Sequence, residues 1–329
     1  MPIVESCKIK DIKADSGQVA VECIVRNVEE KTAKTGNPYL EIEFMDNTGT
    51  IKGRCFDMPK IFATGWVATC YKGALVKVLM EIKLFNGSLA PNVINYRFLT
   101  EDEIEKQGGK QGLVFSVEEN IEELVTELEG FIEETGKYKE VVRAIMADHK
   151  EGFIVAPASK IMHHNCLGGL LYHTVCMLRT ATAMSLTYPL DTELLYAGVI
   201  LHDVMKTEEI GYDELGSPED VYKEPGFLIG HIGLMAIELT KYFEKLKIKE
   251  EYALTEEDEL LLYHVLFSHH GKLEFGSPIR PCIPEAIIIS FIDDVDAKLW
   301  SAFHAINGLE PGTLSPTVKV FGHGIYKRK

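Results

Sequence analysis

Histidine and aspartate residues occur at five places in the last two thirds of the chain, each within an otherwise apolar stretch. Burying a polar group in such a stretch is costly unless the group is hydrogen-bonded, paired with a charge or bound to a metal. One such histidine is more often a hydrogen-bonded core residue than a ligand, but five places together indicate a shared site. The members are His173, His202 with Asp203, His231, His269 with His270, and Asp293 with Asp294 and Asp296.

Imidazole and carboxylate together favour a first-row metal such as Mn, Fe, Co, Ni or Zn over Ca²⁺, which takes oxygen ligands. Because His202 and Asp203 are adjacent, one carboxylate can bridge two ions while the imidazole binds one of them. Two ions about 3.5–4 Å apart can hold the attacking and the leaving oxygens of a phosphate ester. The donor set therefore predicts a divalent-metal site, with two ions, that hydrolyses a phosphate ester.

Helices must position these side chains, because apolar residues from Ser116 onward recur at helical spacing. Ser116-Val-Glu-Glu resembles a capping box and predicts a helix that begins there. Further helices are expected at 137–148, 167–187, 191–205, 226–246, 256–270 and 284–305.

The first 100 residues have a different pattern, with alternation typical of strands at 19–28 and 39–45 and further strand candidates at 51–56 and 75–85. Turn residues such as Asn86-Gly87 fall between them. Five or so short strands in 100 residues predict a small barrel. Residues 101–115 are polar and contain glycine, which is typical of a linker.

The segment KTGNPYLEIEFMDNTGTIKGRCFD, residues 34–57, resembles the first hairpin of OB-folds that bind nucleic acid, where K-x-G-x-x-Y precedes D-x-T-G-x-I. Aromatic side chains on such a sheet stack bases at about 1–3 kcal/mol each, and neighbouring cations contact phosphates. The alternative is that the aromatic residues are barrel core and the cations ordinary surface. The candidate strand contacts are Tyr39, Lys52, Arg54, Phe56, Lys83, Phe85 and Arg97.

The net charge of −16 is unevenly distributed. Residues 1–100 hold 13 basic and 11 acidic side chains, a net of +2, and the remaining 229 residues hold 21 basic and 39 acidic, a net of −18. Such asymmetry can mark different partners for the two parts. It can also mean only that one part has well-solvated acidic helices.

Five motifs resemble the HD-domain metal phosphohydrolases, and among them the two-metal branch. They are G-G-L-x-x-H-T at 168–174, H-D-x-x-K at 202–206, G-H-I at 230–232, S-H-H-G-x-x-x-x-G-S-P-x-R-P at 268–281 and D-x-x-D-A-K at 293–298. With the OB-like segment, they resemble the YhaM family of 3′→5′ exoribonucleases over residues 1–312. The resemblance implies a multidomain fold, in which an all-β OB-fold barrel (1–100), a linker (101–115), an all-α HD-domain bundle (116–312) and a tail (313–329) follow one another.

The same resemblance implies hydrolysis of single-stranded RNA, or single-stranded DNA, from the 3′ end to nucleoside 5′-monophosphates, with Mn²⁺ as the metal. His173, His202, Asp203 and Asp293 would form a first metal site. Asp203 would bridge to a second, completed by His231, His269 and His270. Asp296 would support the metal ligands without binding the metal. Asp203 and Lys206 would act in catalysis, with Lys206 facing the phosphate. His163, His164 and Arg280 would lie along the substrate path.

One position departs from the family pattern. The usual H-D-I-G-K has glycine where this chain has Met205. The larger side chain can narrow the pocket or only repack the helix. Since every ligand is intact, Met205 bears on specificity more than on activity.

Two other functions fit the same residues. One is an HD phosphohydrolase of a small nucleotide, with the barrel as a regulatory or assembly module; the acidic C-terminal part favours it. The other is a single-strand-binding adaptor with an inactive site, against which the complete ligand set argues. Seven scattered cysteines without C-x-x-C, no long apolar run and no leader-like N-terminus predict a cytoplasmic protein with no membrane partner.

Overall fold

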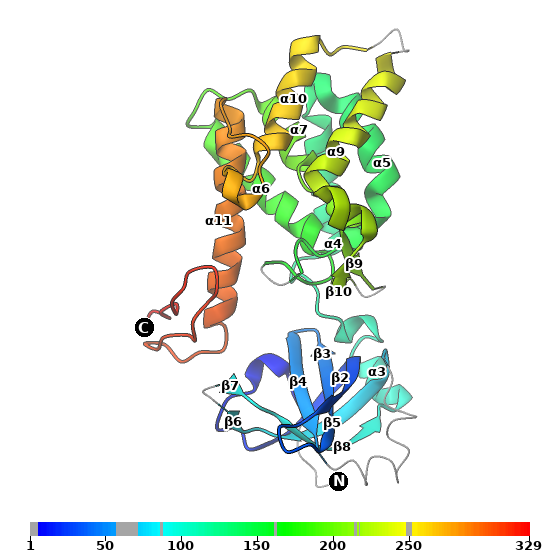
Figure 1. Cartoon of the computed structure of the whole chain (residues 1–329), viewed down its shortest axis with the longest axis vertical. Coiled ribbons are helices and arrows are strands. Elements are labelled where there is room, and N and C mark those ends of the chain that lie inside the picture. Colours follow the sequence, from blue (N-terminus) through cyan, green and yellow to red (C-terminus); the bar gives the residue numbers. More distant parts are fainter. Residues whose placement is uncertain are drawn as a thin grey trace. The chain divides into compact units, whose positions relative to one another are not determined.

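A computed structural model describes residues 6–56, 72–85, 88–160, 163–213, 216, 218–247 and 252–329 (Figure 1). It divides into two compact units, Met1–Ser116 and Val117–Lys329, and each has its own hydrophobic core. The first unit is a β-barrel and the second is helical, so the predicted fold class is confirmed. Among the described helices, none combines the length and the apolar character needed to cross a membrane.

The barrel is closed by five strands in OB-type order. They are β2 (Gln18–Thr32), β3 (Pro38–Asp46), β4 (Gly49–Cys55), β8 (Asn92–Phe98) and β5 (Leu75–Glu81), and β5 pairs back onto β2. β4 and β8 run parallel, whereas the other neighbours in the barrel are antiparallel. The remaining elements of this part are β1 (Ser6–Cys7), which pairs with β2, the turn η1 (Ile9–Asp11), and the hairpin of β6 (Leu84–Phe85) and β7 (Ser88–Leu89).

Strand alternation explains the barrel core. Leu40, Ile42 and Phe44 on β3 are buried, and the residues between them are more exposed. Gly53 on β4 stands where strands approach closely, because a Cβ there would lie 2.7 Å from the Val93 side chain.

A buried aspartate ties the start of the chain to the barrel. Asp46 is fully buried and accepts hydrogen bonds from the Ile9 amide at 2.8 Å and from the Thr48 amide at 2.7 Å. Asp46→Ala would leave these donors without a partner, so we expect a loss of about 2–3 kcal/mol of stability. Thermal unfolding followed by calorimetry measures it. The exposed Asp11→Ala is the matched control, and an equal effect of the two substitutions would contradict the role of Asp46.

The stretch expected to be a linker is folded against the barrel. It holds α3 (Glu101–Lys106) and η2 (Gln111–Leu113). Thr100 caps α3 in a capping box with Glu103. Glu103 also pairs with Arg97 of β8 at 2.5 Å, and Gln107 donates to Glu22 of β2 at 2.7 Å. These bonds make residues 101–113 part of the N-terminal unit.

The second unit contains eight helices among the residues described. They are α4 (Ile121–Glu133), α5 (Lys139–Val155), α6 (Gly169–Ser185), α7 (Thr192–Leu201), α8 (Lys206–Glu209), α9 (Glu224–Lys247), α10 (Glu256–Ser268) and α11 (Pro284–Ile306). The turns η3 (Gly136–Tyr138) and η4 (Leu273–Phe275) and an unforeseen ribbon of β9 (Ile210–Tyr212) and β10 (Pro218–Tyr222) complete it. The expected capping box at Ser116 is wrong, because α4 begins at Ile121 and Asn120 caps it.

Helix α7 is the centre of this unit. Its residues from Leu194 to Leu201 are all buried, and it packs against α6, α10 and α11 (Figure 1). At Gly198 a Cβ would lie 2.7 Å from the Ile289 side chain of α11, so glycine allows the two helices to approach. Because α7 is enclosed, the residues at its C-terminal end enter the middle of the bundle.

Candidate metal centre

The predicted ligands converge at the end of α7. His202 is the C-cap of α7, Asp203 follows it, and His269 is the C-cap of α10. His173 comes from α6, while Asp293 and Asp296 come from α11. Three overlapping groups have donor atoms within 4.8 Å of one another: Asp203, His231, His269 and His270; His173, His202 and Asp203; and His164, His173 and Asp296.

Asp203 lies between the first two groups. Its Oδ2 is 3.1 Å from His202 Nε2 and 3.9 Å from His173 Nε2. Its Oδ1 is 3.5 Å from His231 Nε2 and 3.8 Å from His269 Nε2. Since each oxygen faces a different pair of imidazoles, the carboxylate has the placement of a bridging ligand.

Three atoms in this cluster have no hydrogen-bond partner within the described part of the chain. They are Asp203 Oδ1, His231 Nε2 and His269 Nε2, and all three are buried. Buried polar atoms are normally satisfied. A divalent cation among them would satisfy all three, so the residues present fit a metal.

Groups behind the imidazoles fix their orientation. The Nδ1–H of His202 donates to the Val199 carbonyl and that of His269 to the Leu266 carbonyl, both at 2.7 Å. The Nδ1 of His231 hydrogen-bonds to Glu209, which also accepts from the His231 amide at 2.7 Å. These bonds leave each Nε2 for a metal.

A kink in α9 brings His231 into this position. Gly230 has φ 76° and ψ 157°, a left-handed conformation that favours glycine, and no atom crowds its missing Cβ. The chain therefore needs glycine there for its backbone, not for space. The kink also frees the His231 amide to bond Glu209.

Glu209 is a positioning residue that sequence reasoning missed. We expect Glu209→Gln to weaken metal affinity by about 10–100-fold, because a neutral glutamine side chain would replace the charged carboxylate that hydrogen-bonds the His231 ring. Calorimetric titration with Mn²⁺ measures it, and Glu208→Gln on the same short helix is the control. Unchanged affinity in Glu209→Gln would show that His231 needs no support.

His173 is held by two carboxylates. Its Nδ1 lies 2.6 Å from Asp296 and its Nε2 lies 3.3 Å from Asp293. Burial alone would lower the pKa of His173, but the two carboxylates outweigh it and raise the pKa to about 10. Burial likewise opposes ionisation of Asp293 and Asp296, yet bonds from the histidines lower the pKa of both.

Metal binding should therefore release a proton. In the metal-free protein at pH 7, His173 carries a proton that a metal at Nε2 must displace, so affinity should rise about tenfold per pH unit. Titration in buffers of different ionisation enthalpy counts the protons, and we expect at least one. A proton count of zero would contradict this arrangement.

Without metal, the raised pKa of His173 adds to the free energy of unfolding below about pH 6.5, and this contribution is lost as pH rises towards 10.

His163 and His164 lie beside the first metal group. His164 is buried, has φ 44° and bonds Asp296 at 2.8 Å through Nε2. The His163 ring lies 5.2 Å from that of His173, and its buried Nε2 has no hydrogen-bond partner among the described residues. Burial lowers the pKa of both, so both are neutral at pH 7. Their role along a substrate path stays a prediction.

Lys206 lies against Asp203, with Nζ 2.5 Å from Oδ2. Burial lowers the pKa of Lys206, but Asp203 and Asp293 raise it more, so the amine stays charged.

Three other residues named from the sequence differ in their burial. Met205 is buried in the core before α8. Arg280 and Asp294 lie at the surface; Asp294 pairs with Lys298, and no partner of the Arg280 side chain is found in the described ranges.

Three of the four candidate cations on the barrel pair with acidic side chains. Arg54 pairs with Glu41 at 3.5 Å, Lys83 with Glu81 at 2.7 Å, and Arg97 with Glu103. Tyr39 and Phe56 stack at 5.1 Å, and Phe56 is 56% exposed. Lys52 is exposed, and the side chain of Phe85 lies outside the described residues.

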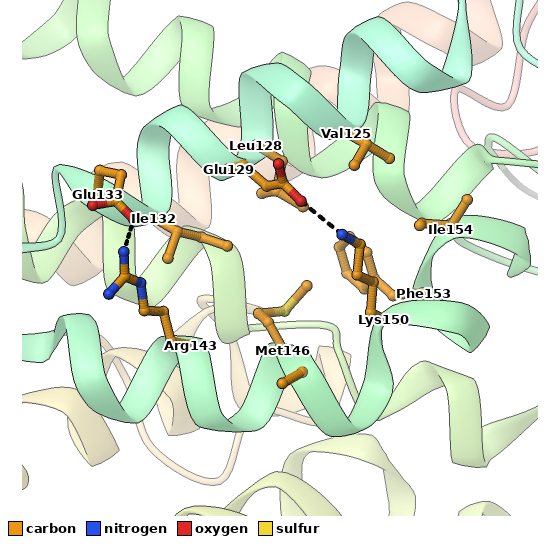
Figure 2. Close-up of a pocket in the computed structure, with 11 residues that line it drawn as sticks. Val125, Leu128, Glu129, Ile132, Glu133, Arg143, Met146, Lys150, Phe153 and Ile154 are labelled. Carbon is orange, nitrogen blue, oxygen red and sulfur yellow. Dashed lines mark hydrogen bonds and ion pairs between the residues drawn. The ribbon is translucent and has the colours of Figure 1, made fainter.

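A cavity of about 320 Å³ between α4 and α5 lies apart from these residues (Figure 2). Its floor is apolar, with Leu128, Met146 and Phe153. Two ion pairs cross it, Arg143 with Glu133 and Lys150 with Glu129. None of the metal-donor groups lines it, so we assign the chemistry to the cluster around Asp203.

The match to a family model agrees with this centre. Residues 170–298 match the family model described as HD domain. The chain is similar to the mitochondrial single-stranded DNA binding protein Rim1 of S. cerevisiae, with 19% identity, 26% of this chain and 96% of that chain covered, and a TM-score of 0.24. It is similar to the second OB-fold domain of replication protein A from Methanococcus maripaludis, with 20% identity, 30% and 97% covered, and a TM-score of 0.22. The chain thus carries at residues 170–298 an HD domain, the domain of metal-dependent phosphohydrolases.

Proposed function

We propose that this protein is a metal-dependent 3′→5′ exoribonuclease that hydrolyses single-stranded RNA to nucleoside 5′-monophosphates. The observation that carries the hydrolytic part is the Asp203 carboxylate, whose two oxygens face different imidazole pairs. The 3′→5′ direction is what the resemblance of the sequence motifs in both units to the YhaM family implies.

Two metal sites would share Asp203. His173, His202 and Asp293 would complete the first, and His231, His269 and His270 the second. When bound, the metal supplies the Lewis acidity that activates water and offsets charge on the phosphate. The imidazole and carboxylate donors suit Mn²⁺ and equally Fe, Co, Ni or Zn.

The protein's own groups would orient and neutralise the scissile phosphate. The charged amine of Lys206, one turn beyond Asp203, is placed to offset charge that develops on a phosphate oxygen. Asp296 holds His173, and Glu209 holds His231, so neither imidazole needs to reorganise during the reaction.

The barrel would hold the strand. Tyr39 on β3 stacks on the exposed Phe56, which directly follows β4, and this stack offers a surface for a base. The exposed Lys52 on β4 can contact a phosphate. Arg97 is less suited than the sequence predicted, because Glu103 occupies its guanidinium.

Product analysis tests the proposal. Purified protein with Mn²⁺ is given a 5′-labelled single-stranded RNA of defined length, with its DNA counterpart alongside, and products are resolved by length over time. A descending ladder with release of mononucleotides supports it, and the ratio of the RNA and DNA rates names the preferred strand. Cleavage at internal positions, or no shortening by metal-loaded protein, would contradict it.

A second candidate is hydrolysis of a small nucleotide by the same centre. It is favoured by the charge of residues 117–312, which hold 15 basic and 35 acidic side chains and would repel a long polyanion. Turnover of a mononucleotide or dinucleotide without turnover of an oligomer would favour this function. Met205→Gly would then test whether the pocket had been narrowed.

A further inference from the structure

The side of α11 that carries Asp296 at the metal centre also carries two aromatic rings further along the helix. Asp296, Trp300 and His304 follow one another at intervals of four residues, which places them along one side of the helix. The Trp300 ring lies 5.4 Å from that of His164 and stacks on His304 at 4.7 Å, with 6° between the planes. His164 itself bonds Asp296. A run of rings therefore leads from the metal centre to the exposed His304.

The chain after α11 folds into a hairpin, residues 312–329. The Ser315 amide donates to the Ile325 carbonyl and the Lys327 amide to the Thr313 carbonyl, both at 2.9 Å. Bridges join Leu314 to Tyr326 and Val318 to His323. Figure 1 shows this C-terminal hairpin, in red, folded next to the C-terminal end of α11. The segment is thus an ordered part of the helical unit.

Its charge is opposite to that of the unit that carries it. Residues 117–312 have a net charge of −20, whereas residues 313–329 hold four basic side chains and no acidic one. The four are Lys319, Lys327, Arg328 and Lys329, and no ion pair of theirs is found in the ranges described. Cations without acidic partners, next to an exposed aromatic side chain such as Tyr326, are what a single strand requires.

We propose that the C-terminal hairpin and the Trp300–His304 stack bind single-stranded nucleic acid and guide it to the metal centre. The four cations would contact phosphates, and unpaired bases would stack at His304. The inference rests on the proposed function, since it takes the strand to be the substrate. It also accounts for how an acidic unit can receive a polyanion. A lipid surface or an acidic protein would use the cations but not the rings.

The test compares two sets of four substitutions in the full chain. One set is Lys319→Gln, Lys327→Gln, Arg328→Gln and Lys329→Gln. The control set makes the same charge change at Lys139, Lys150, Lys241 and Lys245 on α5 and α9. Affinity for a 5′-fluorescein 12-nucleotide single strand is measured by anisotropy in EDTA at several salt concentrations. We expect the hairpin set to weaken binding about 10-fold or more and to reduce the salt slope by about 3.

The stack is tested with a single pair of substitutions. His304→Ala should weaken strand binding about 10-fold, and His304→Phe should restore it, because phenylalanine keeps a ring for stacking.

Binding that is unchanged in the hairpin set, or lost equally in the control set, would overturn the inference. So would a change of oligomeric state in the hairpin set, measured by light scattering, because the hairpin would then hold another copy of the chain.

Cleavage assays separate this inference from the proposed function. With Mn²⁺, the hairpin set should raise KM for the 12-nucleotide strand and leave the cleavage of a dinucleotide unchanged. If the wild-type chain binds the strand through the hairpin but shortens neither substrate, the proposed function fails and the inference stands. If both substrates are cleaved equally well by the wild type and the hairpin set, the inference fails and the proposed function stands.

Discussion

Asp203→Asn is expected to reduce hydrolysis by about 1,000-fold or more. The carboxylate lies within 4 Å of His173, His202, His231 and His269 and contacts Lys206. Its removal takes away the ligand that both metal sites would share and leaves the Lys206 amine buried without a carboxylate partner. A loss of about 4 kcal/mol in transition-state stabilisation corresponds to this factor. Initial rates with Mn²⁺ on a 5′-labelled strand measure it, with the bound metal counted in parallel.

The matched control is Asp294→Asn, because Asp294 is on α11 beside the ligand Asp293 but lies at the surface. We expect this variant to keep wild-type rates. Strand binding to Asp203→Asn, measured without turnover, should remain largely intact, since the proposed strand contacts lie elsewhere. If the variant loses strand binding and hydrolysis equally, the separation between binding and catalysis is wrong.

Lys206→Met is expected to lower kcat by about 100–1,000-fold while two metal ions still bind. The buried amine is the cation nearest to Asp203, and a donor placed at a developing negative charge contributes this much in other enzymes. Methionine keeps the length of the side chain and removes the charge. The measurement is kcat on a 5′-labelled strand at saturating Mn²⁺.

Lys298→Met on α11 is the control for charge removal, because Lys298 pairs only with the surface residue Asp294 among the described acids. Lys206→Arg should recover part of the rate, since it restores the charge but not the shape. If Lys206→Met loses its metal ions together with its activity, the lysine organises the ligands and does not act on the phosphate.

The fold could be predicted from the sequence because each half has one clear periodicity. The alternation at 19–28, 39–45 and 51–56 corresponds to β2, β3 and β4, and the helix expected at 191–205 corresponds to the enclosed α7, which ends at Leu201. Short polar segments were harder to predict. Residues 101–115 were expected to be a linker because they are polar and contain glycine. Their attachment to the barrel depends on the Arg97–Glu103 and Gln107–Glu22 contacts, which no periodicity encodes.

The candidate ligands were visible in the sequence because histidine and aspartate are unusual within apolar helices. Their supporting groups were not. Glu209 is 22 residues from His231 and becomes its partner only through the kink at Gly230. The acid that pairs with Arg54 could not be foreseen either, because Glu41 lies on the neighbouring strand β3 and cross-strand neighbours depend on register.

The proposed function requires Asp203 to lie between two divalent ions. Anomalous diffraction at the manganese edge from crystals grown with Mn²⁺ tests it most directly. We expect two peaks about 3.5–4 Å apart, one on each side of the Asp203 carboxylate. The first should lie beside His173, His202 and Asp293, and the second beside His231, His269 and His270. A single peak, or peaks that Asp203 does not contact, would show that Asp203 does not bridge two ions.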